Sequence, residues 1–352
     1  MDYKVSREFK FGSRLVGSEY PCFVIAEISA NHGGSLGKAL DLVQAAAEAG
    51  ADAIKLQTYT ADTITLNADT DDFQICSGPW LGRSLWDLYK EAHTPWEWHE
   101  AIFQKATKLG LQYFSSPFDE TAVDFLQSLD VAAFKVASPE INHIPLLEKI
   151  ARTGKPVILS AGLATKCDIH LAIDSLKSNG CGEIAVLQCT TAYPAPVEDS
   201  NLNLMARIAH DFDVVTGLSD HSNNPLVGLA AVSAGAKMIE KHITLTEDHT
   251  VDSFFSTNPT DFKTFVRDLR LIETALGKGE YGPAPSALGS MQGRRSIYAS
   301  EDIKKGTEFS VENVICIRPS YGLDPIHWKH ILGAKANRDI KKGQRLLLDD
   351  LN

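Results

Sequence analysis

The chain has 352 residues, of which 44% are hydrophobic and 22% charged, a composition typical of a soluble globular protein. Its 34 Lys and Arg residues against 45 Asp and Glu residues give a net charge of −11, which argues against a nucleic-acid-binding protein because phosphate backbones require clustered cations. No segment approaches the ~18–20 consecutive apolar residues of a membrane span, so we expect no membrane partner.

The N-terminal segment and the cysteines indicate the cellular compartment. Met1–Val5 lacks the basic and then apolar layout of a signal peptide. No two of the six cysteines form a C-x-x-C pair, which fits reduced thiols better than a disulfide framework or a zinc site. We therefore expect a cytoplasmic protein.

Short apolar runs alternate with longer amphipathic segments from about Pro21 to Gly279. We interpret the runs as β-strands: Cys22–Ser29, Ala53–Tyr59, Gln112–Ser115, Ala133–Ala137, Pro156–Ser160, Ile184–Cys189, Val214–Ser219 and Lys237–Lys241. Segments with helical periodicity follow them, such as Leu36–Glu48 and Asp261–Leu276. This pattern predicts an α/β fold, a closed (β/α)8 TIM barrel. A doubly wound open sheet is the alternative, but NHGGS after the first strand is not the G-x-G-x-x-G of nucleotide-binding sheets.

A Gly-, Pro- and Ser-rich segment, Gly277–Gly293, follows the predicted barrel. Beyond it, ASEDIKKG (Ala299–Gly306) recurs as ANRDIKKG (Ala336–Gly343), and an apolar run follows each copy, Val311–Ile317 or Leu346–Leu348. The repeat predicts a small, pseudo-symmetric, β-rich domain. A domain of about 60 residues is near the lower limit of independent stability, so we expect it to dock onto a larger surface. The predicted boundaries are 1–279 for the barrel, 280–293 for a linker and 294–352 for the small domain.

Two lysines lie inside apolar strand runs, Lys55 in DAIKLQT and Lys135 in AAFKVAS. A buried ammonium group is costly unless an anion neutralises it. Three interpretations stay open: an internal salt bridge to Glu27 or Glu140, a pocket for a phosphate or carboxylate, and a Schiff-base lysine. Gln57 shares the strand parity of Lys55, so both are expected inside the barrel. Hydroxyl groups at the strand ends would complete an anion pocket: Ser115, Ser116, Ser138, Ser160, Thr190, Thr191 and Ser219.

His221 and His242 are one strand–helix repeat apart, which places them at the ends of adjacent strands of the predicted barrel. Two such imidazoles can hold one divalent cation, and the surrounding oxygen donors favour Mn²⁺, Mg²⁺ or Co²⁺ over structural zinc. The alternative is a pair of hydrogen-bonded core histidines. Glu27 ends the first strand, which neighbours the eighth in a closed barrel, so its carboxylate can approach His242 as a general acid or base. A helix cap or salt bridge is the structural alternative for Glu27.

Four of the five tryptophans fall in Trp80–Glu100. This segment follows the second predicted strand, and we consider two interpretations equally: a loop that covers a substrate, or an excursion that packs on the barrel.

Several motifs resemble one known family, the sialic-acid synthases. They are VIAEISANHGGSL, GADAIKLQTYT, FSSPF, FKVASPEINHIPLLEKIARTGKPVILSAG, QCTTAYPAP, GLSDHS and IEKHITL. The tail SIYASEDIKKGTEFSVENVICIRPSYGL is similar to the antifreeze-like (SAF, β-clip) domain that ends members of this family. The resemblance extends from about Phe23 to Asp350. Within the family, SANHGGSL, LQTYTADTITL, the tryptophan-rich segment and RPSYGL are most similar to the branch that makes pseudaminic acid.

The resemblance implies a metal-dependent condensation of phosphoenolpyruvate with the open-chain aldehyde of an N-acetylated amino sugar. The products are a nine-carbon 2-keto acid and phosphate. It assigns the metal to His221 and His242, and the handling of a water or hydroxyl proton to Glu27. Phosphoenolpyruvate is assigned to Lys55, Ser116, Lys135, Ser138, Ser160, Thr191 and Ser219. The sugar is assigned to Gln57, Glu140, Tyr193 and Asp252.

The resemblance also implies a homodimer in which the C-terminal domains are exchanged. Arg318 of IRPSYG matches the arginine that this domain brings to the N-acyl group of the sugar in the partner subunit. The chain departs from the sialic-acid pattern at Ser116 and Ala161, where that pattern has Thr, and in VDSFFS (Val251–Ser256). These departures weaken an assignment to N-acetylmannosamine as the sugar.

Three other functions stay open. The first is the sister reaction that yields N-acetylneuraminic or legionaminic acid. The second is a carbohydrate- or ice-binding module, which leaves the lysines and histidines at the strand ends without a role. The third is a Schiff-base aldolase.

Overall fold

The structure is a computed structural model that describes residues 8–245 and 249–351. Met1–Val5, on which the signal-peptide interpretation depends, lies outside these residues. The chain divides into two compact units, and the boundary between them in the sequence lies between Gly277 and Lys278, directly after helix α10 (Pro259–Leu276). The first unit contains the barrel, and the second contains the repeat.

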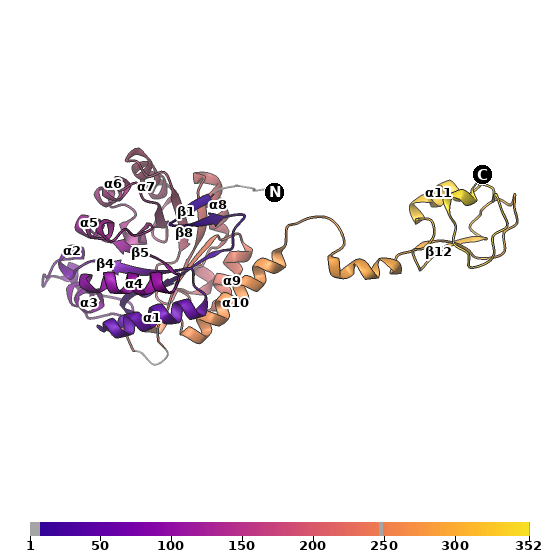
Figure 1. Ribbon diagram of the computed structural model, residues 1–352. Coiled ribbons are helices and arrows are strands. Elements are labelled where there is room, and N and C mark those ends of the chain that lie inside the picture. The colour runs from indigo at the N-terminus through magenta and orange to yellow at the C-terminus, as the bar shows by residue number, and fades with distance from the viewer. Residues whose placement is uncertain (1–7, 246–248, 352) are drawn as a thin grey trace. The chain divides into compact units, whose positions relative to one another are not determined.

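The first unit is built on a closed barrel of eight parallel strands (Figure 1). Strands β3 to β10 follow one another around the barrel in chain order, and β10 pairs with β3 to close it. The predicted (β/α)8 barrel is therefore confirmed, and each predicted run overlaps one of its strands. The strands are β3 Phe23–Glu27, β4 Ala53–Thr58, β5 Gln112–Pro117, β6 Phe134–Val136, β7 Val157–Ser160, β8 Ile184–Cys189, β9 Val215–Asp220 and β10 Met238–His242.

Helices pack around the outside of these strands (Figure 1). Local signals set their ends, as α1 illustrates: Ser35 caps its first turn by accepting a hydrogen bond from the Lys38 N–H, and Gly50 ends it at a φ of 87° that favours glycine. Two short helices, α2 (Ala61–Ile64) and α3 (Leu85–Ala92), lie between β4 and α4. The surrounding helices are α1 Leu36–Ala49, α4 His99–Lys108, α5 Glu120–Ser128, α6 Ile144–Ala151, α7 Lys166–Ser178, α8 Asn203–Phe212, α9 Pro225–Ser233 and α10.

A hairpin that the sequence analysis did not predict fills the amino-terminal end of the barrel. It consists of β1 (Glu8–Phe11) and β2 (Arg14–Gly17). Phe11 is fully buried, and its ring centroid lies 4.9 Å from that of Phe23 and 4.9 Å from that of Phe114. The amino-terminal half of the barrel interior is thus an apolar core, which leaves the carboxyl half to polar side chains.

The second unit contains a two-stranded antiparallel sheet, β11 (Ser296–Ala299) and β12 (Val314–Ile317), and a short helix, α11 (Trp328–Ile331). The two repeat copies pair with each other: Ile303 bridges Ile340, and reciprocal ion pairs join Lys304 to Asp339 at 2.8 Å and Lys341 to Asp302 at 2.7 Å. The internal pseudo-symmetry predicted from the sequence is present.

Two further segments of the second unit have local helical structure. In the apolar run Leu346–Leu348, Leu346 is buried in the core of the unit, and Leu348 begins a 3-10 helix (Leu348–Asp350). The segment predicted as a linker contains a 3-10 helix, Pro285–Gly293, with exposed side chains. Within residues 8–245 and 249–351, no helix combines the length and apolar character needed to cross a membrane.

Candidate active site

The strand register brings polar side chains together at the carboxyl end of the barrel. Alternate residues of a strand point inward, so Lys55 and Gln57 on β4 and Glu240 and His242 on β10 share the interior. The register pairs Glu27 with Lys55 on one side and with His242 on the other. Buried polar side chains from the first and last strands of the barrel thus lie together at its carboxyl end, where the active sites of this fold usually lie.

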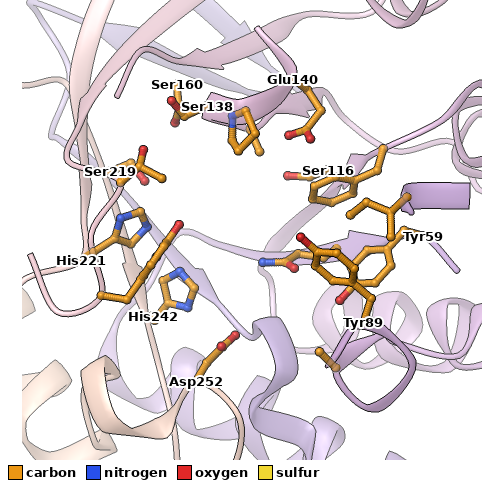
Figure 2. A pocket seen from close by; sticks show the side chains of 18 of the residues that line it. Tyr59, Tyr89, Ser116, Ser138, Glu140, Ser160, Ser219, His221, His242 and Asp252 are labelled. Carbon is orange, nitrogen blue, oxygen red and sulfur yellow. The ribbon is translucent and has the colours of Figure 1, made fainter. Parts of the chain in front are cut away.

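These side chains surround a cavity of about 460 Å³ (Figure 2). All the site residues proposed from the sequence line it except Glu27, Ser115, Thr190 and Arg318. The Ser115 hydroxyl instead pairs with that of Thr58, and the Thr190 hydroxyl donates to the Asp199 carbonyl. Glu27 lies fully buried behind Lys55 and Gln57, and Arg318 belongs to the second unit. The proposed residues that line the cavity are Lys55, Gln57, Ser116, Lys135, Ser138, Glu140, Ser160, Thr191, Tyr193, Ser219, His221, His242 and Asp252.

Lys55 occupies the centre of a buried charge network. Its Nζ lies 2.7 Å from Glu27 Oε2, 3.5 Å from Glu240 Oε1 and 3.3 Å from Ser116 Oγ. Burial lowers the pKa of Lys55, but the charges of Glu240 and Glu27 outweigh it, so the pKa rises. Burial raises the pKa of Glu27 to about 7 against the opposing charge of Lys55. The salt bridge considered from the sequence is therefore present, and Lys55 stays charged at the cavity wall.

Lys135 has a different environment from that of Lys55. Its Nζ donates hydrogen bonds to Ser160 Oγ at 2.6 Å and to the Val136 carbonyl at 3.2 Å. In the part of the chain that the structure describes, no carboxylate forms an ion pair with it, and burial lowers its pKa. A cation that lines a cavity without a paired carboxylate is suited to an anionic ligand.

His221 and His242 face each other with ring centroids 5.3 Å apart. The Nδ1 of His221 donates to the Thr190 carbonyl at 3.0 Å, so Nε2 is the acceptor when the ring is neutral. Burial lowers the pKa of His221, but the charge of Cys189 outweighs it, so the pKa rises. The Nδ1 of His242 is buried without a hydrogen-bond partner, and burial followed by the charge of His221 holds the pKa of His242 well below its usual range.

Two imidazoles held in this way fit a divalent cation. A neutral ring and an unpartnered buried nitrogen are what a metal ligand requires. The described residues contain no group of three or more His, Cys, Asp or Glu side chains arranged for a metal. A cation at this position would therefore be held by two protein ligands, with its other positions left to water or substrate.

Two carboxyl groups lie elsewhere on the cavity wall (Figure 2). Burial raises the pKa of Glu140 to about 7, and its Oε2 is buried without a partner. Burial raises the pKa of Asp252 to about 6, and Asp252 accepts hydrogen bonds from the Ser29 hydroxyl and the Ala30 N–H. Tyr193 contacts His221, with ring centroids 4.7 Å apart. The wall thus offers polar groups to a second, less charged ligand.

The sequence analysis missed some of the lining residues. Glu240 was not singled out, although its position two residues before His242 gives it the same inward parity. Cys189 was treated only as a reduced thiol, yet it lines the cavity, two residues before Thr191. Strand parity was a sufficient signal for both residues. The same parity would have found Tyr59, which ends the predicted strand Ala53–Tyr59 two residues after Gln57. Tyr89, by contrast, reaches the cavity from helix α3, where strand parity gives no signal.

Different parts of the tryptophan-rich segment border the cavity and pack on the barrel. Trp80 lines the cavity, and its indole N–H donates to the Val251 carbonyl at 3.2 Å. Trp96 stacks on Phe125 of α5, with ring centroids 4.7 Å apart. Packing on the barrel is therefore present in the second half, while the first half borders the cavity and its role as a cover for a substrate stays a prediction.

A TIM barrel whose carboxyl end gathers cations, hydroxyls and imidazoles around one cavity has the architecture of a barrel enzyme. Residues 42–281 match the NeuB family, and residues 294–352 match the SAF domain. The chain belongs to the NeuB family. The match confirms the resemblance to the sialic-acid synthases and the assignment of the C-terminal unit.

Individual relatives agree with this assignment. The chain is 45% identical to the pseudaminic acid synthase of Campylobacter jejuni over 93% of this chain and 96% of that protein. It is 35% identical to the N,N'-diacetyllegionaminic acid synthase of Legionella pneumophila over 97% of each chain. The solved N-acetylneuraminic acid synthetase of Leptospira borgpetersenii superposes with a TM-score of 0.72 at 30% identity, covering 81% of this chain and 95% of that one.

Proposed function

We propose that this protein is a pseudaminic acid synthase, a transferase that forms a carbon–carbon bond. It condenses phosphoenolpyruvate with the open-chain aldehyde of 2,4-diacetamido-2,4,6-trideoxy-L-altrose and releases pseudaminic acid and phosphate. The observation that carries the proposal is one cavity, in a NeuB-family barrel, that holds two buried lysines beside two facing histidines. The identity to a pseudaminic acid synthase exceeds that to a legionaminic acid synthase, which supports this choice of sugar.

Phosphoenolpyruvate carries a phosphate and a carboxylate, and the proposed site offers donors to both. The Lys55 and Lys135 ammonium groups neutralise the charge, and Lys135 is already held by the Ser160 hydroxyl. The hydroxyl groups that complete the site are those of Ser116, Ser138, Ser160, Thr191 and Ser219. Holding the enol in a fixed position next to the sugar removes much of the entropic cost of a bimolecular step.

The condensation proceeds by attack of carbon 3 of phosphoenolpyruvate on the aldehyde carbon, which leaves a cationic carbon 2. Water adds to carbon 2 with loss of a proton, and departure of phosphate then leaves the ketone. We assign Glu27 to the proton of that water or of the sugar. Lys55, which lies between the cavity and the carboxylate, passes a proton to Glu27 and takes one from the reacting group, while Gln57 orients the carboxylate by a hydrogen bond. A divalent cation, Mn²⁺, Mg²⁺ or Co²⁺, held by His221 and His242 would supply Lewis-acid polarisation of the aldehyde oxygen.

We assign the sugar to the polar groups beyond the anion site. Glu140 and Asp252 have raised pKa values, so each can donate or accept a hydrogen bond near neutral pH. Gln57 and Tyr193 complete this side of the cavity. Arg318 of a partner subunit would bind the acetamido carbonyl, which requires a homodimer with exchanged C-terminal domains.

We also propose a cytoplasmic location. All six cysteines are free, which suits a reducing compartment.

The deciding experiment is product identification. Purified protein is incubated with phosphoenolpyruvate, Mn²⁺ and a panel of sugars: 2,4-diacetamido-2,4,6-trideoxy-L-altrose, its mannose-configured counterpart and N-acetylmannosamine. Phosphate release and the NMR spectrum of the product should identify pseudaminic acid from the first sugar. Preferential use of either other sugar would instead make the chain an N-acetylneuraminate or legionaminate synthase. Covalent trapping of Lys135 by borohydride with substrate would indicate a Schiff-base aldolase.

A further inference from the structure

The cavity wall divides by chemistry and by the origin of its residues. The barrel strands contribute polar side chains, whereas the segment between β4 and α4 contributes mainly apolar ones. We define the apolar wall as Ile64, Ile75, Leu85, Leu88, Tyr89 and Ala92. Only Leu88 of these six is buried, and the others are partly exposed. A ligand in the cavity would therefore remove apolar surface from water along this wall.

Helix α3 supplies most of the wall through a single face. Leu85, Leu88, Tyr89 and Ala92 are spaced as neighbours on one side of a helix, and all four line the cavity. Other contacts support the helix: Ser84 Oγ caps it by accepting from the Asp87 N–H at 3.0 Å, and the Trp86 indole N–H donates to Asp62 of α2 at 2.8 Å. An apolar helix face usually packs on the protein core, but this face is turned toward the substrate cavity.

The wall lies opposite the reacting groups. Figure 2 shows Tyr59 and Tyr89 across the cavity from His221 and Ser219. In the proposed reaction the aldehyde carbon lies beside the histidines and phosphoenolpyruvate, so the other end of the open-chain sugar points away from them. Carbon 6 is therefore the sugar carbon that reaches the apolar wall.

We propose that the apolar wall is the specificity surface for the sugar. It binds the methyl group at carbon 6 and the methyl of the acetamido group at carbon 4, and it rejects sugars with a hydroxyl at carbon 6. The inference rests on the proposed function and adds the part of the substrate that the cavity recognises. A hydroxyl against these side chains loses its water without gaining a partner, whereas a methyl group gains contact.

The test replaces one residue of the wall and a matched residue outside it. Leu85→Gln places an amide in the wall, whereas Leu81→Gln makes the same change at a 65% exposed leucine of the same segment that does not line the cavity. We expect Leu85→Gln to lower kcat/KM for the 6-deoxy sugar by roughly 10- to 200-fold and to lower it much less for the 6-hydroxy analogue. The KM for phosphoenolpyruvate should not change, and Leu81→Gln should resemble the parent protein.

A second variant guards against a folding defect. Ala92→Ser adds one hydroxyl group to the wall, and thermal unfolding followed by circular dichroism would verify both folds. It should shift the ratio of kcat/KM between the two sugars in the same direction by a smaller factor. If both variants reduce the use of the two sugars equally, or change neither, the wall does not determine specificity.

The outcome is separable from the proposed function. If the parent protein does not use the trideoxy-altrose, the proposed function fails, whatever the variants do. The wall is then tested with the 6-deoxy and 6-hydroxy forms of the sugar that the parent protein accepts. A parent protein that uses both forms equally would overturn the inference while leaving the proposed reaction intact.

Discussion

Burial gives the individual side chains of the cavity their chemical character. Lys55 is almost inaccessible to solvent, yet two carboxylates keep it charged. Among the described residues, the hydrogen-bond partners of Lys135 are a hydroxyl and a carbonyl group. His242 is neutral because it is buried and lies near other positive groups. At the scale of single residues, the cavity therefore places a charged lysine, Lys55, near a neutral imidazole, His242.

The first prediction concerns the two histidines. His221→Ala or His242→Ala should abolish Mn²⁺ binding, measured by isothermal titration calorimetry, and with it the activity that EDTA removes and Mn²⁺ restores in the parent. The fold should persist because the barrel core does not include these rings. His170→Ala is the control, since His170 pairs with Asp174 on the outside of α7. Full activity in His242→Ala would contradict the metal assignment.

The second prediction concerns Glu27. Glu27→Gln keeps the shape but removes the charge that pairs with Lys55, so binding of phosphoenolpyruvate should persist or strengthen. Turnover should fall by ~10²–10⁴-fold if the carboxylate moves a proton. Equilibrium binding and steady-state rates measure the two effects separately. An unchanged turnover would mean that Glu27 only positions Lys55.

The third prediction concerns pH. Burial raises the pKa of Glu140 to about 7, so the folded protein holds this proton more tightly than the unfolded chain does. That stabilisation is complete below the unfolded pKa and is lost as the pH rises through about 7. Glu140→Gln cannot titrate, so its free energy of unfolding does not include this loss. Between pH 4 and pH 8, the free energy of unfolding of the variant should therefore rise relative to that of the parent by on the order of 1–3 kcal/mol. Urea unfolding measures this difference, and parallel pH profiles would contradict it.

Whole elements act on the site from both ends of the barrel. The β1–β2 hairpin closes the amino-terminal end and makes the interior there apolar, while the segment with α2 and α3 borders the cavity at the other end. Both elements are additions to the strand–helix repeat, and neither contributes a barrel strand. The barrel positions the reacting groups, and these additions set the boundaries of the interior.

The fourth prediction tests the hairpin. Phe11→Ala should destabilise the protein by about 3–5 kcal/mol, because the ring is fully buried between Phe23 and Phe114 and its removal leaves a cavity. Leu15→Ala in the same hairpin is the control, since Leu15 is 41% exposed and its loss should cost much less. Chemical denaturation measures both values. Equal effects would show that the hairpin does not seal the barrel core.

At the scale of the whole molecule, the chain consists of two compact units, and Arg318 lies in the unit without the cavity. The second unit is held by its own core and by reciprocal ion pairs between the repeat copies. A contribution of Arg318 to the sugar site therefore requires docking between units. The family resemblance assigns that docking to a partner subunit.

The fifth prediction tests this docking. Arg318→Ala and His221→Ala should each be inactive alone, but subunits mixed by co-expression should regain activity. In an exchanged dimer both defects fall in one site, which leaves the other site intact. Recovery of up to half of the parental activity per heterodimer, measured by phosphate release, is expected in this arrangement. Mixtures as inactive as the single variants would mean that the arginine acts within its own chain.

The sequence by itself determined the barrel and most of its polar mouth. Strand and helix periodicity are local properties, so the runs around Lys55, Lys135, His221 and His242 identified both the elements and the inward-facing side chains. Chain order around a (β/α)8 barrel then fixed which strand ends are neighbours, including the closure that pairs Glu27 with His242.

Only the tertiary structure decided which partners these side chains meet. The choice of Glu27 over Glu140 as the partner of Lys55, and the position of Glu27 behind the cavity, depend on register and on side-chain directions across several strands. The packing of the β1–β2 hairpin in the barrel and of the apolar wall along the cavity joins segments far apart in sequence, and no local periodicity predicts such contacts. Burial and long-range contact, rather than residue type alone, therefore decided the boundaries and the charge states of the site.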